Sequence, residues 1–337
     1  MKYFIGLLFA LTFTPSLALP THAQSVVDES GYIKAYKRMG WTKTEFNKRS
    51  IALKDILSGG PSKDGIPPID NPIFKPIAEV KEIAAREPVV GFSINGDARA
   101  YPLRVLTWHE IVNDNVGGKP VTITYCPLCN AAIVFDRTLD GKVLDFGTTG
   151  LLRNSDLVMY DRQTESWWQQ FTGTSIVGSM MGKQLKVLPA RLESYANFKK
   201  RFPKGKVLVP NNNGMRDYGR NPYANYDSAV RPFLYSGSMP KGIKPMERVV
   251  AFKVNGEIKV YGLPLLAKKG KISQDTFTIE WKAGQASALD TSIISKGRDV
   301  GNIIVQAKNG GKWEDIAYDV TFAFVVHAFY PKAKFIH

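Results

Sequence analysis

Cysteine and histidine are scarce in this chain of 337 residues, which has only two cysteines and four histidines. Two cysteines are too few for a disulfide scaffold, so the fold must be stabilised by packing. Both lie in one motif, Cys126-Pro127-Leu128-Cys129, and Asn130 follows where a haem-attachment motif would have histidine. No second C-x-x-C and no H-x-x-x-H is present, so a zinc-finger type of structural site is not supported.

Long apolar runs are also lacking, except at the N-terminus. There, Lys2 precedes a mostly apolar stretch from Tyr3 to Leu19, and Thr21-His22-Ala23 offers small residues for cleavage after Ala23. This pattern predicts a signal peptide over residues 1–23, and the stretch is too short and interrupted for a membrane span. We therefore expect a soluble mature protein without a transmembrane segment, in a periplasm or outside the cell.

Acidic residues are few, and the formal net charge is +15. The excess is concentrated in residues 183–282, where 20 Lys and Arg face 7 Asp and Glu, a balance of +13. The lysines are scattered along the sequence, which favours a basic surface that faces solvent and keeps the protein soluble. The alternative is that the 183–282 region binds an anionic partner. No nucleic-acid recognition motif is present, and neither G-x-S-x-G nor H-E-x-x-H occurs, so nucleic-acid binding and common hydrolase chemistry are not indicated.

The chain divides into an N-terminal segment and one large β-rich region. Residues 24–76 predict polar helical structure followed by a Pro-rich connector, with four large side chains as docking points: Tyr36, Met39, Trp41 and Phe46. Residues 77–337 predict short strands, a helix over 192–202, an irregular loop over 210–240 and a terminal strand over 320–329. The expected fold class is mainly β or α+β, with a few peripheral helices.

An internal repeat lies within the β-rich region. Residues 89–106 and 249–266 share eight of eighteen positions at an offset of 160. Each copy has apolar alternation on either side of Asn-Gly, the pair that favours a two-residue hairpin turn. The repeat therefore predicts two related units, each with a β-hairpin and a Leu-anchored turn.

The two copies differ in their chemistry. Thr107-Trp108-His109-Glu110 in the first copy corresponds to Ala267-Lys268-Lys269-Gly270 in the second. The histidine, the glutamate and both cysteines belong to the first unit alone. We therefore expect function to be concentrated in that unit.

The cysteine motif has three possible roles. Two thiols at this spacing can bind one metal ion, can form a reversible disulfide, or can form a purely structural pair. A redox motif of the thioredoxin type would normally begin a helix, whereas this one precedes an apolar stretch over 131–135 that predicts a strand. This context favours a metal site.

His109 lies just before the cysteine-bearing strand, so a hairpin-like return would bring its imidazole beside the thiolates. The predicted ligands are Cys126, Cys129 and His109, with Met159 and His327 as weaker candidates for a fourth position. Thiolate with imidazole suits copper or zinc, and a thioether would favour copper, so copper is expected ahead of zinc. Glu110 could orient His109, act as a catalytic base or cap a helix near Trp108.

A second polar cluster spans residues 161–170, where Asp161, Arg162 and Trp168 stand close together. These residues could form a hydrogen-bond network that supports the site from behind, or an elaborate β-turn. Both alternatives remain open from the sequence.

Several of these stretches resemble the secreted domain-of-unknown-function family 3179. They are Tyr101-Pro102-Leu103, residues 109–114, residues 124–129, the 161–168 cluster and Ala328-Phe329-Tyr330-Pro331. The resemblance covers about residues 65–335 and implies an exported protein, without implying an activity. Residues 322–327 depart from the family pattern, which has tryptophans there, and this weakens the case for His327 as a ligand.

Three hypotheses follow. The first is an exported metalloprotein whose open coordination position serves catalysis or metal handling for a small molecule or a periplasmic protein. The second is a thiol–disulfide redox protein that uses Cys126 and Cys129. The third is a β-rich binding module with a structural cysteine pair.

Overall fold

The computed structural model describes residues 28–337, so the predicted signal peptide lies outside the described residues. Within this range the chain forms twenty-four strands in six sheets and five α-helices. The mainly β or α+β prediction is confirmed. None of the helices in this range is both long and apolar enough to span a membrane.

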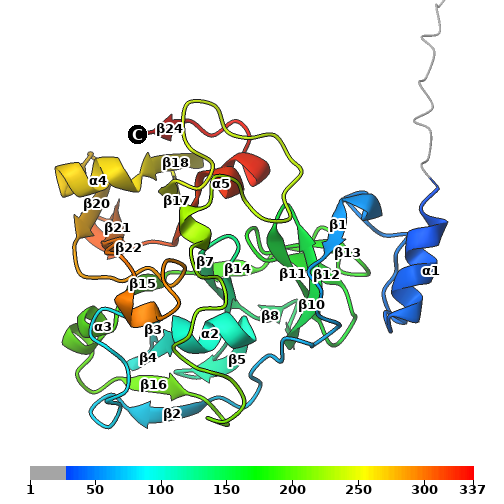
Figure 1. Cartoon of the computed structure of the whole chain (residues 1–337), viewed down its shortest axis with the longest axis horizontal. Coiled ribbons are helices and arrows are strands. Elements are labelled where there is room, and N and C mark those ends of the chain that lie inside the picture. Colours follow the sequence, from blue (N-terminus) through cyan, green and yellow to red (C-terminus); the bar gives the residue numbers. More distant parts are fainter. Residues whose placement is uncertain (1–27) are drawn as a thin grey trace, which may run out of the picture.

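The internal repeat extends to two units with the same order of elements (Figure 1). The first unit comprises β3 (Pro88–Ile94), β4 (Asp97–Pro102), α2 (Leu103–His109), β5 (Ile111–Val116), β6 (Lys119–Cys126), β7 (Ala131–Asp136), β15 (Arg191–Ser194), α3 (Tyr195–Arg201) and β16 (Lys206–Val209). The second comprises β17 (Arg248–Val254), β18 (Glu257–Gly262), α4 (Leu263–Lys269), β19 (Lys271–Ser273), β20 (Phe277–Lys282), β21 (Asn302–Asn309), β22 (Lys312–Asp315), β23 (Tyr318–Phe322), α5 (Ala323–Phe329) and β24 (Phe335–Ile336).

Strand pairing repeats as well. The first unit has the sheet β15-β3-β4-β16, extended by β2 (Ile73–Pro76), and the second has β23-β17-β18-β24. In both, the strand before the last helix pairs antiparallel with the hairpin and the strand after it pairs parallel. A second sheet accompanies each hairpin: β14 (Lys186–Leu188)-β7-β6-β5 in the first unit and β19-β20-β21-β22 in the second.

Both predicted hairpins are confirmed. Asn95 and Gly96 connect β3 to β4 with φ of 51° and 80°, and Asn255 and Gly256 connect β17 to β18 with φ of 51° and 81°. Two consecutive positive φ angles are the mark of the turn that matches the natural twist of a hairpin. The predicted Leu-anchored turns are the short helices α2 and α4, which begin at Leu103 and Leu263.

A further sheet is inserted in the first unit between β7 and β14. It contains β10 (Phe146–Arg153), β11 (Asp156–Asp161), β12 (Trp167–Gln169) and β13 (Thr174–Val177), with β1 (Ile56–Ser58) at one edge. A two-stranded ribbon, β8 (Thr138–Leu139) and β9 (Lys142–Val143), precedes it.

The N-terminal segment packs on this inserted sheet, with α1 (Ser30–Arg38) beside it (Figure 1). Three of the four predicted docking residues, Tyr36, Trp41 and Phe46, are buried around Trp167, with ring centroids 4.9–5.4 Å from it. The fourth, Met39, is 47% exposed.

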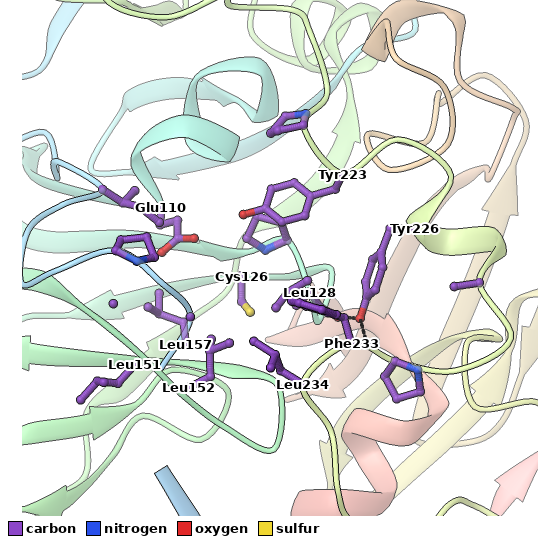
Figure 2. Close-up of a pocket in the computed structure, with 18 of the residues that line it drawn as sticks. Glu110, Cys126, Leu128, Leu151, Leu152, Leu157, Tyr223, Tyr226, Phe233 and Leu234 are labelled. Atoms are coloured by element: carbon purple, nitrogen blue, oxygen red, sulfur yellow. Dashed lines mark hydrogen bonds between the residues drawn. The ribbon is translucent and has the colours of Figure 1, made fainter. Parts of the chain in front are cut away.

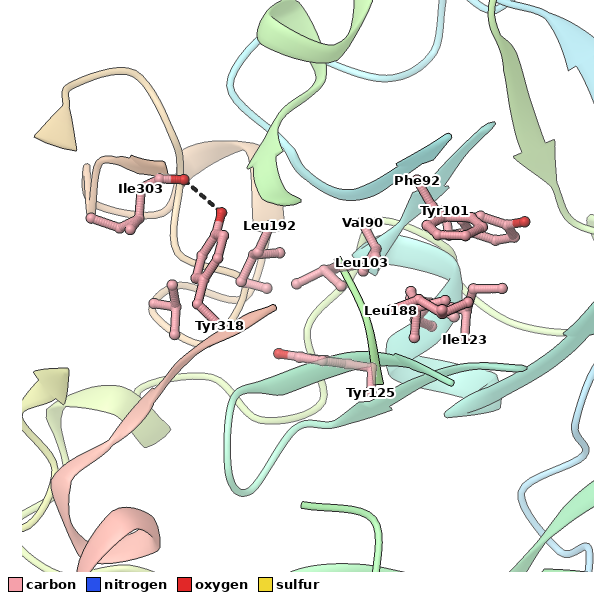
Figure 3. Close-up of a cluster of buried hydrophobic side chains, with 14 of the residues drawn as sticks. Val90, Phe92, Tyr101, Leu103, Ile123, Tyr125, Leu188, Leu192, Ile303 and Tyr318 are labelled. Carbon is pink, nitrogen blue, oxygen red and sulfur yellow. Dashed lines mark hydrogen bonds between the residues drawn. The ribbon is translucent and has the colours of Figure 1, made fainter. Parts of the chain in front are cut away.

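One hydrophobic core joins the two units. It contains Val90 and Phe92 from β3 together with Val250 and Phe252 at the corresponding positions of β17. Figure 3 shows Leu192 and Tyr125 from the first unit near Tyr318 from the second, whose hydroxyl donates to the Ile303 carbonyl at 2.6 Å. Full burial of each large apolar side chain stabilises the fold by roughly 1.5–3 kcal/mol, so the units fold as one body around this core.

Three element predictions are corrected by the structure. Of the segment predicted to be helical, the described residues 28–60 are helical only in α1 and in a 3-10 turn, Leu53–Asp55. The helix predicted from residue 192 begins at Tyr195, because residues 191–194 pair with β3. The predicted terminal strand ends at Phe322 and continues as helix α5, since an apolar run fits either structure until its neighbours decide. The 210–240 loop is irregular as predicted, apart from the 3-10 turn Tyr226–Ser228.

Candidate functional site

The cysteine motif forms a tight turn between β6 and β7. The Cys129 amide donates to the Cys126 carbonyl at 3.2 Å, and Asn130 has a φ of 50°, which reverses the chain into β7. Both sulfur atoms lie on one side of this turn, because both thiols donate to the carbonyl oxygen of Ser155, at 3.7 Å from Cys126 and 3.5 Å from Cys129. Both cysteines are buried free thiols.

The second unit fixes this turn from behind. The Thr321 hydroxyl donates to the Cys129 carbonyl at 2.7 Å, and the Asn130 side-chain amide donates to the Val320 carbonyl at 2.7 Å. Both partners lie on β23. The position of the two thiols therefore depends on the duplicated architecture.

Asp156 completes a group of three possible metal ligands. One of its carboxylate oxygens and the two sulfur atoms all lie within 4.8 Å of one another. The Oδ2 atom accepts hydrogen bonds from the Gln169 side chain at 2.6 Å and from the Phe171 amide at 2.9 Å. Within residues 28–337 the buried Oδ1 atom has no hydrogen-bond partner, which is unusual since buried polar atoms are nearly always hydrogen-bonded.

Burial dominates the electrostatics of this group. It raises the pKa of Cys126, and it raises that of Cys129 well above its ordinary value. It also raises the pKa of Asp156 to about 6, although the hydrogen bonds from Phe171 and Gln169 oppose the change. Within residues 28–337, no lysine or arginine forms an ion pair with Asp156. The site thus holds acidic groups that need a positive charge to ionise.

Glu110 stands beside this group in a strained conformation. It follows α2 with φ of 57° and ψ of −32°, and its counterpart in the second unit is Gly270, with φ of 68° and ψ of −43°. Such angles favour glycine, and a residue with a side chain is strained there. Burial and the nearby Asp156 raise the pKa of Glu110 to about 8.

A pocket of about 640 Å³ opens over Cys126. Glu110, Cys126 and Leu128 line one side, and residues 222–234 of the long loop line another (Figure 2). The loop is held in place by the Ser155 hydroxyl, which donates to the Phe233 carbonyl at 2.5 Å, and by the Tyr226 hydroxyl, which donates to the Leu128 carbonyl at 3.0 Å. One thiol of the pair therefore faces a cavity large enough for a small molecule.

The structure does not bring His109 to the thiols. Its Nδ1 atom lies 2.7 Å from the Pro67 carbonyl, and its Nε2 atom lies 2.8 Å from the Tyr218 hydroxyl. A carbonyl only accepts, so Nδ1 carries the proton and Nε2 accepts from Tyr218. Burial lowers the pKa of His109, so both ring nitrogens of a neutral imidazole are occupied away from the site.

The other two predicted ligands lie in different surroundings. Met159 is buried in the middle of β11, three residues beyond Asp156. His327 lies on α5, where its Nε2 atom is 3.0 Å from the Ser238 hydroxyl. Met159 does share a hydrophobic cluster with both cysteines, whereas His327 belongs to the surface of the second unit.

The 161–170 cluster forms a turn network. Asp161 accepts from the Thr164 amide at 2.7 Å and from the Trp168 indole at 2.9 Å, and Arg162 donates to Asp70 at 2.6 Å. These three bonds do not reach a cysteine, but Gln169 of the same cluster donates to the Oδ2 atom of Asp156 at 2.6 Å, so the cluster also supports the candidate site. Trp168 supports the region by packing, because it belongs to the same hydrophobic cluster as both cysteines.

Sequence reasoning missed two parts of the site. Asp156 begins strand β11, where three apolar residues follow it, and an acidic residue at that place was a usable signal. The loop residues Tyr223 and Tyr226 lie about a hundred positions after the cysteines, and nothing in their local pattern indicates that they cover this pocket. Glu110 was detectable because the repeat aligns it with Gly270.

The chain matches one family model, described as Protein of unknown function (DUF3179), over residues 63–333. This match covers most of the chain, so the protein belongs to that family, as its motifs suggested. No curated protein and no solved structure matches the chain.

Proposed function

We propose that this member of the DUF3179 family binds one metal ion through Cys126, Cys129 and Asp156 and presents it to the pocket. The observation that supports the proposal best is the grouping of these three ligand atoms within 4.8 Å, with the buried Oδ1 atom of Asp156 left without a partner among the described residues. A cation supplies the positive charge that the acidic groups lack, and it favours their deprotonation.

The ligand set changes the expected metal. Copper was favoured over zinc on the strength of an imidazole and a thioether, but both ring nitrogens of His109 bond elsewhere and a carboxylate, Asp156, joins the thiols instead. Two thiolates and a carboxylate suit Zn²⁺, which takes sulfur and oxygen ligands in tetrahedral sites, whereas Cu⁺ would rely on the thiolates alone. We therefore place zinc first and copper second.

Three protein ligands leave one tetrahedral position, the arrangement found in catalytic rather than structural zinc sites. A bound metal would supply Lewis-acid chemistry at that position. Glu110 lines the same pocket and, with a pKa of about 8, can hold or accept a proton near neutral pH. The proposal therefore includes both catalysis and metal handling in an exported protein, with residues 1–23 as its signal peptide.

Metal titration of the chelator-treated protein tests this proposal. We expect one Zn²⁺ per chain, with binding abolished by Cys129→Ser and weakened at least tenfold by Asp156→Asn. His109→Gln is the matched control and should keep the metal, since both of its ring nitrogens bond elsewhere. Failure of the wild-type protein to bind Zn²⁺ or Cu⁺, or binding that survives Cys129→Ser, would overturn the proposal.

A dithiol redox function is the second candidate. Its specific support is the buried Asp156 beside two unpaired thiols, because a carboxylate with a pKa of about 6 can accept a thiol proton. In such a step the two thiols lose two electrons and two protons to a partner disulfide, which becomes two thiols. The raised pKa of both thiols counts against it, since the thiolate is the nucleophile.

Thiol titration separates these alternatives. A reversible disulfide in metal-free protein would favour the redox function, and an inert disulfide that affects only stability would favour a structural pair in a binding module. The anionic partner proposed for residues 183–282 is a separate question. Several of the basic residues there already have acidic partners, as in the Arg191–Asp315 and Arg248–Asp227 pairs.

A further inference from the structure

The pocket over Cys126 is apolar along most of its wall. Its apolar side chains come from the connector, the cysteine turn, the inserted sheet and the long loop, and they include Ile66, Leu128, Leu151, Leu152, Leu157 and Leu234. Such a wall does not bind a metal ion or a strongly hydrated molecule. It is typical of sites for small organic ligands, which are mostly apolar with a few placed polar groups.

Three polar groups of the pocket lie together beside Cys126, whereas Asn225 and Arg231 line it from exposed positions of the long loop. Figure 2 shows the Glu110 carboxyl group, the Tyr223 hydroxyl and the Cys126 sulfur around the same part of the pocket. Charge on Glu110 and on Cys126 raises the pKa of Tyr223, after burial as the main cause, which agrees with their proximity. The pocket therefore has an apolar body, a buried polar end beside Cys126, and exposed polar residues on the long loop.

Glu110 lacks a side-chain partner within the described part of the chain. The residue is only 7% exposed, and the hydrogen bonds it forms involve its backbone: its amide donates to the Leu106 carbonyl and its carbonyl accepts from the Tyr125 amide. Its carboxyl oxygens are open to the pocket rather than fully enclosed, so their hydrogen-bond partners must come from the pocket. A ligand there is their natural partner.

The backbone at Glu110 strengthens this argument. The fold needs only the backbone conformation, as Gly270 shows at the equivalent place in the second unit. A side chain in such a conformation costs about 1–3 kcal/mol. The first unit tolerates this cost and also buries a carboxyl group, which points to a ligand-binding role for the side chain.

We infer that the pocket binds a small, uncharged and mostly apolar organic molecule whose single hydrogen-bonding group is received by Glu110 and Tyr223 beside Cys126. The pocket of about 640 Å³ lies within the usual range for such ligands. This inference goes beyond the metal proposal, because Glu110, Tyr223 and the apolar wall are not among the proposed metal ligands.

A fluorescent probe tests the inference. N-phenyl-1-naphthylamine is uncharged and apolar and carries one N–H donor, and its emission rises when it leaves water. We expect saturable binding to the wild-type protein at one site per chain. Leu152→Arg, which places a charge in the wall, should weaken binding at least tenfold, whereas Leu139→Arg, outside the pocket, should leave it unchanged.

The polar end is tested by a paired comparison. Glu110→Gly removes the carboxyl group at a position whose backbone suits glycine, and it should weaken the amine probe roughly five- to tenfold. Phenylnaphthalene, which lacks the amine, should bind the wild type and Glu110→Gly equally. Equal binding of the amine probe to both proteins would overturn the role of Glu110, and an unaffected Leu152→Arg would overturn the site itself.

The two proposals fail separately. Cys129→Ser should lose the metal and keep the probe. If Cys129→Ser also lost the probe, the organic ligand and the metal would share one site, and the claim of a separate organic site would be wrong. If the wild-type protein bound the probe but no metal, only the metal proposal would be wrong.

Discussion

Replacing Glu110 with glutamine should remove a pH-dependent penalty from the stability of the metal-free protein. Burial raises the pKa of Glu110 from its ordinary value of 4.5 to about 8. Between these values the folded protein keeps a proton that the unfolded chain releases, so stability falls as the pH rises through this window. The penalty is absent below about pH 4 and complete above about pH 8.

The size of the effect follows from linkage. Each pH unit between the two pKa values lowers the free energy of unfolding by about 1.4 kcal/mol. The penalty is therefore roughly 3 kcal/mol at pH 7 and roughly 5 kcal/mol above pH 8. These are upper magnitudes, because the unfolding equilibrium also responds to other groups. A glutamine side chain has a similar shape and does not ionise, so Glu110→Gln should become progressively more stable than the wild type as the pH rises.

Urea unfolding across the pH range is the assay. The difference between wild type and Glu110→Gln should be small near pH 4.5 and largest near pH 8, while the exposed Glu79→Gln serves as a control with no such trend. A difference that stays constant with pH, or that favours the wild type at high pH, would refute the burial of an unpaired carboxyl group at this position.

Three further predictions concern strain, packing and charge. Glu110→Gly should be more stable than Glu110→Ala by about 1–2 kcal/mol in thermal unfolding, because only glycine relieves the positive φ; equal stability would refute the strain. Trp41→Ala should cost about 3–5 kcal/mol in urea unfolding, since Trp41 is fully buried, whereas Met39→Ala should change stability by less than about 0.5 kcal/mol; a similar loss in both would contradict the docking of the N-terminal segment. Asp227→Asn should cost about 3–5 kcal/mol in the same assay because it leaves Arg248 buried without its partner, and a loss below about 1 kcal/mol would contradict this pairing.

Local patterns predicted the elements that depend on local chemistry. Asn-Gly at 95–96 and 255–256 predicted both hairpins, because few other residue pairs tolerate two positive φ angles. The repeat at an offset of 160 between residues 89–106 and 249–266 predicted the two units. The same offset aligns Glu110 with Gly270, which showed that the two units differ in chemistry at this position. The irregular 210–240 loop was also predicted, by its composition.

Long-range contacts decided the rest. The apolar run after residue 322 becomes α5 because it follows β23 just as α3 follows β15, and no local period distinguishes that helix from a strand. His109 is close to the cysteines in sequence, but the C-terminal end of α2 directs it to Pro67 and Tyr218. Asp156 lies beside the thiols because the inserted sheet folds back onto the cysteine turn. The spacing of residues in the sequence does not predict this contact.

X-ray absorption of the zinc-loaded protein tests the central claim most directly, because it counts the ligand atoms by type. The account predicts two sulfur ligands at about 2.3 Å and oxygen ligands at about 2.0–2.2 Å. A spectrum with no sulfur, or one dominated by imidazole scattering, would contradict a metal site built from Cys126, Cys129 and Asp156.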